Sequence, residues 1–133
     1  MKYLCLVYHD EKQLDALPRS EYDALVAATL AYDEEIRTSG YFIASNILDS
    51  VQTATTIRVR GGRVSVTDGP FAETREQLGG YVLIEARDLN AAIRVASRMP
   101  PARMGCIEVR PIKDLAPANR AEVATKTIEG AFP

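Results

Sequence analysis

The chain has 133 residues, of which 47% are hydrophobic and 26% are charged, and its formal net charge is −2. This length and composition indicate a single soluble domain whose core needs neither disulfides nor a structural metal. The slightly acidic balance argues against a nucleic-acid-binding protein, which needs clustered basic side chains. No apolar run approaches the roughly 20 residues that span a bilayer. We therefore expect neither nucleic acid nor a membrane among the partners.

The two cysteines, Cys5 and Cys106, are too few for a disulfide framework. With one histidine in the chain, they also offer no spacing that is typical of a metal site. The first residues lead directly into strand-like sequence, without the three regions of a secretory signal. These features predict reduced thiols, a cytoplasmic location, and no bound metal or cofactor.

Hydrophobic periodicity predicts main strands, helices and an inserted hairpin. The first helix is expected to begin near Ser20, a good N-cap residue, and to end at Gly40. The hairpin is expected to turn at the Gly61-Gly62 pair, because tight hairpin turns require positive φ. The second helix is expected to begin after Asp88, which serves as its N-cap. In chain order, the elements are a strand over residues 2–8, a helix over 20–40, a strand over 41–48, hairpin arms over 55–60 and 63–67, a strand over 81–86, a helix over 88–99 and a strand over 106–112.

Without the hairpin, this order is the βαββαβ arrangement of a ferredoxin-like α+β domain, in which helices cover one face of an antiparallel sheet. Residues 1–112 are expected to form this domain. Residues 113–133 mix helix-forming residues with proline and glycine, so we expect a C-terminal arm that is partly helical or mobile.

Alternation along the main strands divides their side chains between an apolar face and a mixed face. The apolar set is expected on the helix-covered side of the sheet, and the mixed set on the uncovered side. A mixed face suits either a homodimer interface, which we favour, or the wall of a small-molecule cavity. The apolar set is Leu4, Leu6, Val82, Ile84, Ile107 and Val109, and the mixed set is Tyr3, Cys5, Val7, His9, Tyr81, Leu83, Glu85, Cys106, Glu108 and Arg110.

Residues 66–81 read VTDGPFAETREQLGGY, with an Asp-Gly-Pro turn after the hairpin and a Gly-Gly pair before the next strand. The Gly79-Gly80 pair allows a β-bulge or a close backbone approach at that point. This segment closely resembles the DGPF-type branch of the YCII-related proteins, which are small bacterial proteins. The opening strand, the hairpin entry and the last two strands also resemble the family, so the resemblance covers about residues 1–112.

The resemblance implies a ferredoxin-like domain that pairs into a dimeric α/β barrel. It also implies a His-Asp pair in a cleft and, in one branch, dehalogenating or lyase-type chemistry on ring compounds. The only histidine here is His9, and the first helix has none between Ser20 and Gly40, so the pair does not transfer directly. DGPF proteins also resemble modules associated with extracytoplasmic-function sigma factors, which implies a regulatory alternative.

Asp68 is the first candidate for acid-base chemistry, because its carboxylate either accepts from its own turn or projects into a cleft as a general base. His9 is the candidate partner, since histidine exchanges protons readily near neutral pH. The candidates for ligand binding combine aromatic surfaces with charges that hold a polar molecule. They are Tyr3, Phe71, Glu73, Arg75, Tyr81 and Arg110.

Two functions are compatible with these residues. The first is a small cofactor-free acid-base enzyme, of isomerase or lyase type, in which Asp68 and His9 act on a small polar or aromatic molecule near the DGPF segment. The second is a non-catalytic dimeric module that binds a ligand or regulates a sigma factor, which is favoured by the incomplete His-Asp pair. Turnover of a small substrate distinguishes the first function from the second.

Overall fold

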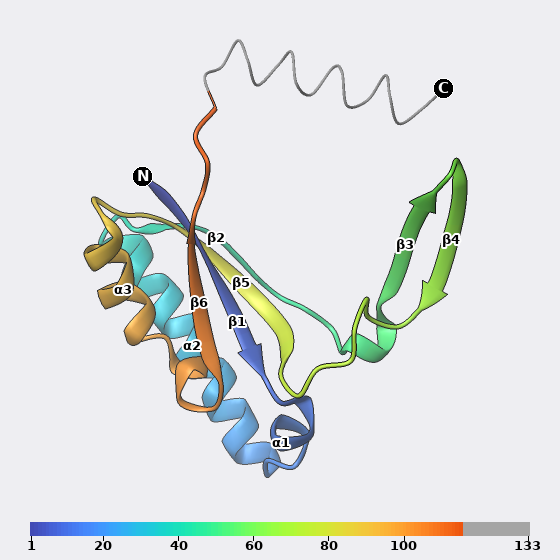
Figure 1. Cartoon of the computed structure of the whole chain (residues 1–133). Coiled ribbons are helices and arrows are strands. Elements are labelled where there is room, and N and C mark those ends of the chain that lie inside the picture. Colours follow the sequence, from blue (N-terminus) through green and yellow to red (C-terminus); the bar gives the residue numbers. More distant parts are fainter. Residues whose placement is uncertain (116–133) are drawn as a thin grey trace.

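The computed structural model describes residues 1–115, which form a four-stranded antiparallel sheet and a separate two-stranded hairpin (Figure 1). The order of strands in the sheet is β2 (Phe42–Ile47), β5 (Gln77–Glu85), β1 (Lys2–His9) and β6 (Cys106–Pro111). Helices α2 (Arg19–Thr38) and α3 (Leu89–Ser97) lie on the same face of the sheet. This strand order, with the helices on one face, confirms the ferredoxin-like α+β fold.

The hairpin between β2 and β5 also confirms the sequence prediction. Its arms are β3 (Thr55–Arg60) and β4 (Arg63–Asp68), and a short 3-10 turn, η1 (Val51–Thr53), leads into them. Gly61 and Gly62 have φ angles of 56° and 76°, which is the left-handed conformation that a tight hairpin turn needs. At the base, the amide of Gly69 donates to the carbonyl of Ala54 over 2.7 Å.

The start of α2 differs from the prediction. The N-cap residue is Pro18, which makes no side-chain cap, so the expected capping role of Ser20 is wrong. Proline has a fixed φ and no N–H, and the chain enters the helix directly after it. A short helix that the sequence did not predict, α1 (Glu11–Asp15), follows β1, and the Asp10 carboxylate caps it by accepting from the Lys12 amide over 2.9 Å. The predicted cap of α3 is confirmed, since Asp88 accepts from the amide of Ala91.

The two faces of β1 are exchanged relative to the expectation. Cys5 lies opposite Val82 of β5, and directly opposed residues share a face of the sheet. Tyr3 and Cys5 are therefore buried beneath the helices, with 2% and 0% of their surface exposed, whereas Leu4 and Leu6 lie on the uncovered face. Both faces of β1 carry apolar side chains, so the alternation pattern does not indicate which face is buried. A shift of one residue in the assignment moves every side chain of the strand to the other face.

A buried hydrogen bond joins α2 to α3 above the core. The Tyr32 hydroxyl donates to the Val95 carbonyl over 2.7 Å, and burial raises the pKa of Tyr32 above its usual value. Arg98 stacks on the Tyr32 ring and pairs with Glu35 at 2.8 Å on the protein surface. The buried residues of α3 are mostly small and belong to the core cluster, among them Ala92.

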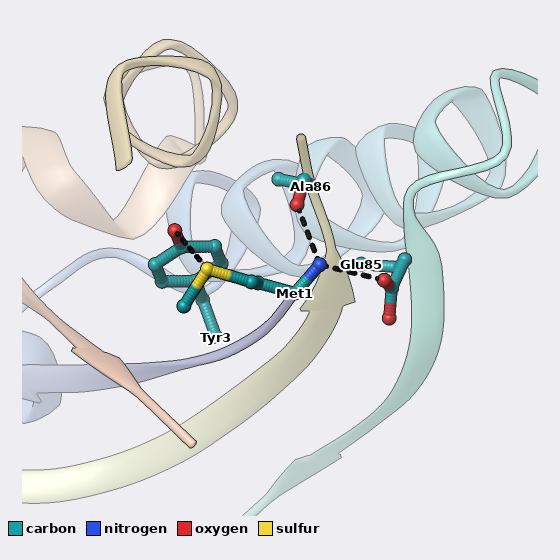
Figure 2. A network of polar contacts seen from close by, with 4 residues as sticks. All are labelled: Met1, Tyr3, Glu85 and Ala86. Carbon is teal, nitrogen blue, oxygen red and sulfur yellow. Dashed lines mark hydrogen bonds and ion pairs between the residues drawn. The ribbon is translucent and has the colours of Figure 1, made fainter. Parts of the chain in front are cut away.

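The first residue of the chain is held at the end of β5 (Figure 2). The ammonium group of Met1 donates to Glu85 Oε1 over 2.8 Å and to the Ala86 carbonyl over 3.0 Å. The Tyr3 hydroxyl lies 3.7 Å from the Met1 sulfur. These contacts hold the first residue against the end of β5.

The face of the sheet turned away from α2 and α3 is called the open sheet face. Its apolar members are half-buried, and its members on β6 are exposed. It therefore remains a mixed face of apolar and charged groups, as the sequence predicts, but with different residues from β1. The face includes Leu4, Leu6, Tyr8, Ala44, Asn46, Tyr81, Leu83, Glu85, Cys106, Glu108 and Arg110.

Residues 113–115 follow β6, and the rest of the predicted C-terminal arm lies outside the described residues. Across residues 1–115, no helix has both the length and the apolar character needed to cross a membrane.

Candidate functional site

A cavity lies between α2 and the sheet, near the ends of β1 and β5. Its volume of about 90 Å³ is several times the roughly 10–15 Å³ that one water molecule occupies. It therefore has room for a small ligand. Most of the lining is apolar and includes Val7, Leu14, Leu25, Val26, Val82 and Pro101.

The cavity contains one buried carboxylate, that of Asp33. This residue belongs to α2, is 8% exposed, and accepts a hydrogen bond from Ser45 Oγ over 2.7 Å. Ser45 lies in β2 opposite Val82, so its side chain shares the helix-covered face of the sheet. Asp33 belongs to none of the ion pairs among residues 1–115. A buried carboxylate with a hydroxyl donor and an apolar surrounding is able to exchange a proton with a ligand.

His9 also lines this cavity, and a β-bulge makes room for its ring. The register of β1 against β5 shifts after Val7, where Val7 faces Gly80 and Tyr8 faces Leu78, so Gly79 is the bulged residue. A Cβ at Gly79 would lie 2.0 Å from His9 Cε1. The bulge and close approach predicted for the Gly-Gly pair are therefore both confirmed, and the imidazole occupies the space that a side chain at Gly79 would need.

The predicted residues of the DGPF segment lie elsewhere. Asp68 is exposed at the end of β4, opposite Thr55, and does not line the cavity that His9 lines. Phe71, Glu73 and Arg75 are exposed in the loop that follows. Arg75 contributes to two polar grooves that both include Asp10, rather than to the apolar cavity. The structure therefore does not bring Asp68 and His9 into one cavity.

The remaining candidates are one core residue and two residues of the open sheet face. Tyr3 is part of the core. Tyr81 contributes to the cavity lining, and its hydroxyl accepts from Asn46 Nδ2 over 2.8 Å. Arg110 is exposed on the open sheet face. Among these three, only Tyr81 belongs to the cavity lining, but its side chain shares the open sheet face with Leu6 and does not point toward Asp33.

Asp33 and Ser45 were missed in the sequence, although one signal for Asp33 was present. In the predicted helix over residues 20–40, apolar residues recur at helical spacing along one stripe that includes Val26, and Asp33 falls in this stripe, seven residues after Val26 and four after Thr29. An acidic residue in the register of a buried stripe is unusual and marks a candidate site. No comparable signal existed for Ser45, because serine is common on strands of either exposure. Within the described part of the chain, no three histidine, cysteine or acidic side chains are grouped closely enough to hold a metal ion.

Comparison with known proteins gives a family, a relative and a structural neighbour. The YCII-related domain matches residues 1–116. An uncharacterised protein of Rhizobium meliloti (strain 1021) is 33% identical over 114 residues, which are 84% of this chain and 92% of that protein. The structure of 5-chloro-2-hydroxyhydroquinone dehydrochlorinase from Burkholderia phenoliruptrix AC1100, in complex with 2,5-dihydroxybenzoquinone, is similar with a TM-score of 0.51. That match has 15% sequence identity and covers 86% of this chain and 96% of the neighbour, so it supports the fold.

Proposed function

Because this chain belongs to the YCII-related domain family and holds a buried carboxylate in an apolar cavity, we propose that it is a small acid-base enzyme. The observation that carries the proposal is the placement of Asp33, whose carboxylate is hydrogen-bonded to Ser45 and which lines a mostly apolar cavity. Buried carboxylates are costly, and proteins keep them mainly where they have a specific partner or a chemical role.

In the proposed reaction, Asp33 removes a proton from the bound molecule and becomes a neutral acid. Ser45 orients the carboxylate through its hydroxyl. His9, on the opposite wall formed by β1, transfers a proton to or from a second atom of the ligand. Return of the proton to a different atom gives an isomerisation, whereas departure of an anionic group from the deprotonated ligand gives a lyase reaction.

The proposed substrate is a small ring compound with polar substituents. The apolar walls from α2 and β1 suit the body of a ring, and the polar groups of the cavity suit one or two oxygens. The structural neighbour is a dehydrochlorinase whose complex holds a dihydroxybenzoquinone, which agrees with this class.

The test is a screen by ¹H NMR in D₂O. The chain is incubated with small carbonyl compounds, phenols and halogenated hydroquinones, and we expect exchange of a carbon-bound proton or loss of a substituent in at least one of them. A His9→Gln variant is expected to lower that rate, because it removes the imidazole that transfers the second proton in the proposed reaction. Binding without any exchange or elimination would contradict the enzyme and support the non-catalytic ligand-binding module.

We also propose that the chain forms a homodimer through the open sheet face. The support for this is the mixture of half-buried apolar side chains, such as Leu6 and Leu83, with exposed charges of Glu108 and Arg110. A sheet face of this kind is typical of an interface with an apolar centre and a polar rim.

Thiol reactivity gives a direct test of this interface. Cys106 lies on the open sheet face and is exposed, whereas Cys5 is buried. Burial raises the pKa of Cys5 to about 11, so its thiol stays protonated and shielded until the chain unfolds. We expect the alkylation rate of Cys106 to fall at least about tenfold as the protein concentration rises through the dimerisation range. A Cys106→Ser variant should show no fast-reacting thiol, and a rate that does not depend on concentration would exclude this interface.

A further inference from the structure

One face of the β3–β4 hairpin carries an apolar stripe that is open to solvent. In the register of the hairpin, Ile57 lies opposite Val66 and Val59 lies opposite Val64, so these four side chains project from the same face. Between 56% and 67% of the surface of each one is exposed. Single exposed apolar residues are common, but an aligned set of four β-branched side chains indicates a surface that becomes covered.

The other face of the hairpin is polar, so the hairpin is amphipathic. It carries Thr56, Thr67, Arg58, Ser65, Arg60 and Arg63 in opposed pairs. The side-chain hydrogen bonds that support the hairpin lie near its base, where Thr56 Oγ1 donates to the Gly69 carbonyl and Arg58 donates to the Phe71 carbonyl. A two-stranded hairpin with no cover is marginally stable in water. The stripe therefore needs a partner surface.

The position of the hairpin indicates where that partner lies. In Figure 1 the hairpin stands apart from the sheet, on the side away from α2 and α3. This is the side toward which the open sheet face is turned. A molecule seated on the open sheet face would therefore have the hairpin beside it.

The distribution of charge favours a second copy of this chain as that molecule. Residues 55–67 contain three arginines and no acidic residue, which leaves 13 basic and 18 acidic side chains in the rest of the chain. The hairpin thus has a charge of +3 and the remainder has a charge of −5. The arginines lie on the polar face, so their charge attracts the arm toward an acidic body without forming contacts beneath the stripe. In a two-fold dimer, each arm meets the body of the other copy.

We propose that the β3–β4 hairpin is an arm that packs its apolar stripe on a second copy of this chain, which returns the same contact. The inference extends the proposed homodimer and is independent of the chemistry in the cavity. It assigns to residues 55–67 a role in association that the open sheet face alone does not require.

Sedimentation velocity over a range of concentrations tests the arm. We compare the wild-type chain with a Val59→Lys, Val64→Lys variant, and with a Ser65→Lys, Thr67→Lys control that adds the same charge on the polar face of the hairpin. The apolar-face variant is expected to weaken dimerisation at least about 100-fold, and the control less than about threefold, because a buried lysine without a partner is costly. If the wild type and the apolar-face variant had equal dimerisation constants, the proposed role of the hairpin would be wrong. The proposed dimer through the open sheet face would not be affected by that result.

Hydrogen exchange provides a second measurement that also detects misfolding. In the wild type, the amides of residues 55–67 are expected to become protected as the concentration rises. In the apolar-face variant they should stay unprotected, while peptides from β1 and β5 keep wild-type protection. Hairpin exchange that is independent of concentration up to about 100 µM would overturn the proposal. Protection that appears on addition of a DNA duplex instead of more protein would also overturn it, in favour of a nucleic-acid-binding hairpin.

Discussion

Replacement of Asp33 by asparagine should lower the rate with any substrate found by the screen by about 10²–10⁴-fold, the range typical of a lost general base. The amide is nearly isosteric with the carboxylate, and its oxygen is still able to accept from Ser45 Oγ. The free energy of unfolding should therefore change by no more than about 1 kcal/mol. Steady-state kinetics and urea unfolding of the same preparations measure the two effects separately.

The matched control is Asp23→Asn on the same helix. Asp23 is exposed and pairs with Arg19 at 3.1 Å, away from the lining of the cavity. A surface ion pair of this kind contributes little to stability, so neither rate nor stability should change appreciably. If Asp33→Asn kept more than about a third of the wild-type rate in a folded protein, Asp33 would not be the general base.

Replacement of Gly80 by alanine should destabilise the domain by about 2–3 kcal/mol, because the new Cβ overpacks a sheet that has no room for it. That Cβ would lie 2.7 Å from the carbonyl oxygen of Asn46 and 3.4 Å from the Cα of Ile47, both of which are backbone atoms of β2. The two strands have to separate locally to relieve the clash. Chemical denaturation gives the size of the loss.

Gly79→Ala is the informative comparison, because its Cβ meets a side chain instead of backbone. The His9 ring is able to rotate away, so the stability loss should be smaller than for Gly80→Ala, whereas the NMR signals of the His9 ring should shift strongly. If Gly79→Ala and Gly80→Ala lost the same free energy of unfolding, the β-bulge would limit substitution at both positions, and the clash with β2 would not explain the loss at Gly80.

The hairpin was predictable from sequence almost to the residue. Its signals are local, since Gly61 and Gly62 allow positive φ and both arms alternate strictly. The strand order followed from the sequence of elements, because the βαββαβ arrangement has few compatible topologies. These parts of the fold depend on near neighbours in the chain or on general rules of connection.

The buried face of β1 was not predictable in the same way. It depends on the register against β5, which pairs Cys5 with a residue far along the chain, and both faces of β1 offer apolar side chains. The candidate site shows a similar contrast. The sequence indicates His9 because it is the one histidine of the chain. Asp33, which lines the same cavity, comes from a different element. The DGPF motif predicts Asp68 in its place, and Asp68 is exposed. Sequence motifs identify where a chain turns more readily than which side chains meet.

The hairpin is inserted between two strands of the sheet and contributes no residue to the buried core cluster of the described chain. Changes in its length, charge or apolar stripe therefore leave the packing beneath the helices untouched, since surface insertions cost a fold little. In the proposed dimer and the proposed reaction, partner choice and cavity chemistry therefore reside in separable parts of one small domain. Homologues with this architecture are therefore able to change their binding partner without changing the cavity. They are equally able to change the cavity without changing the assembly.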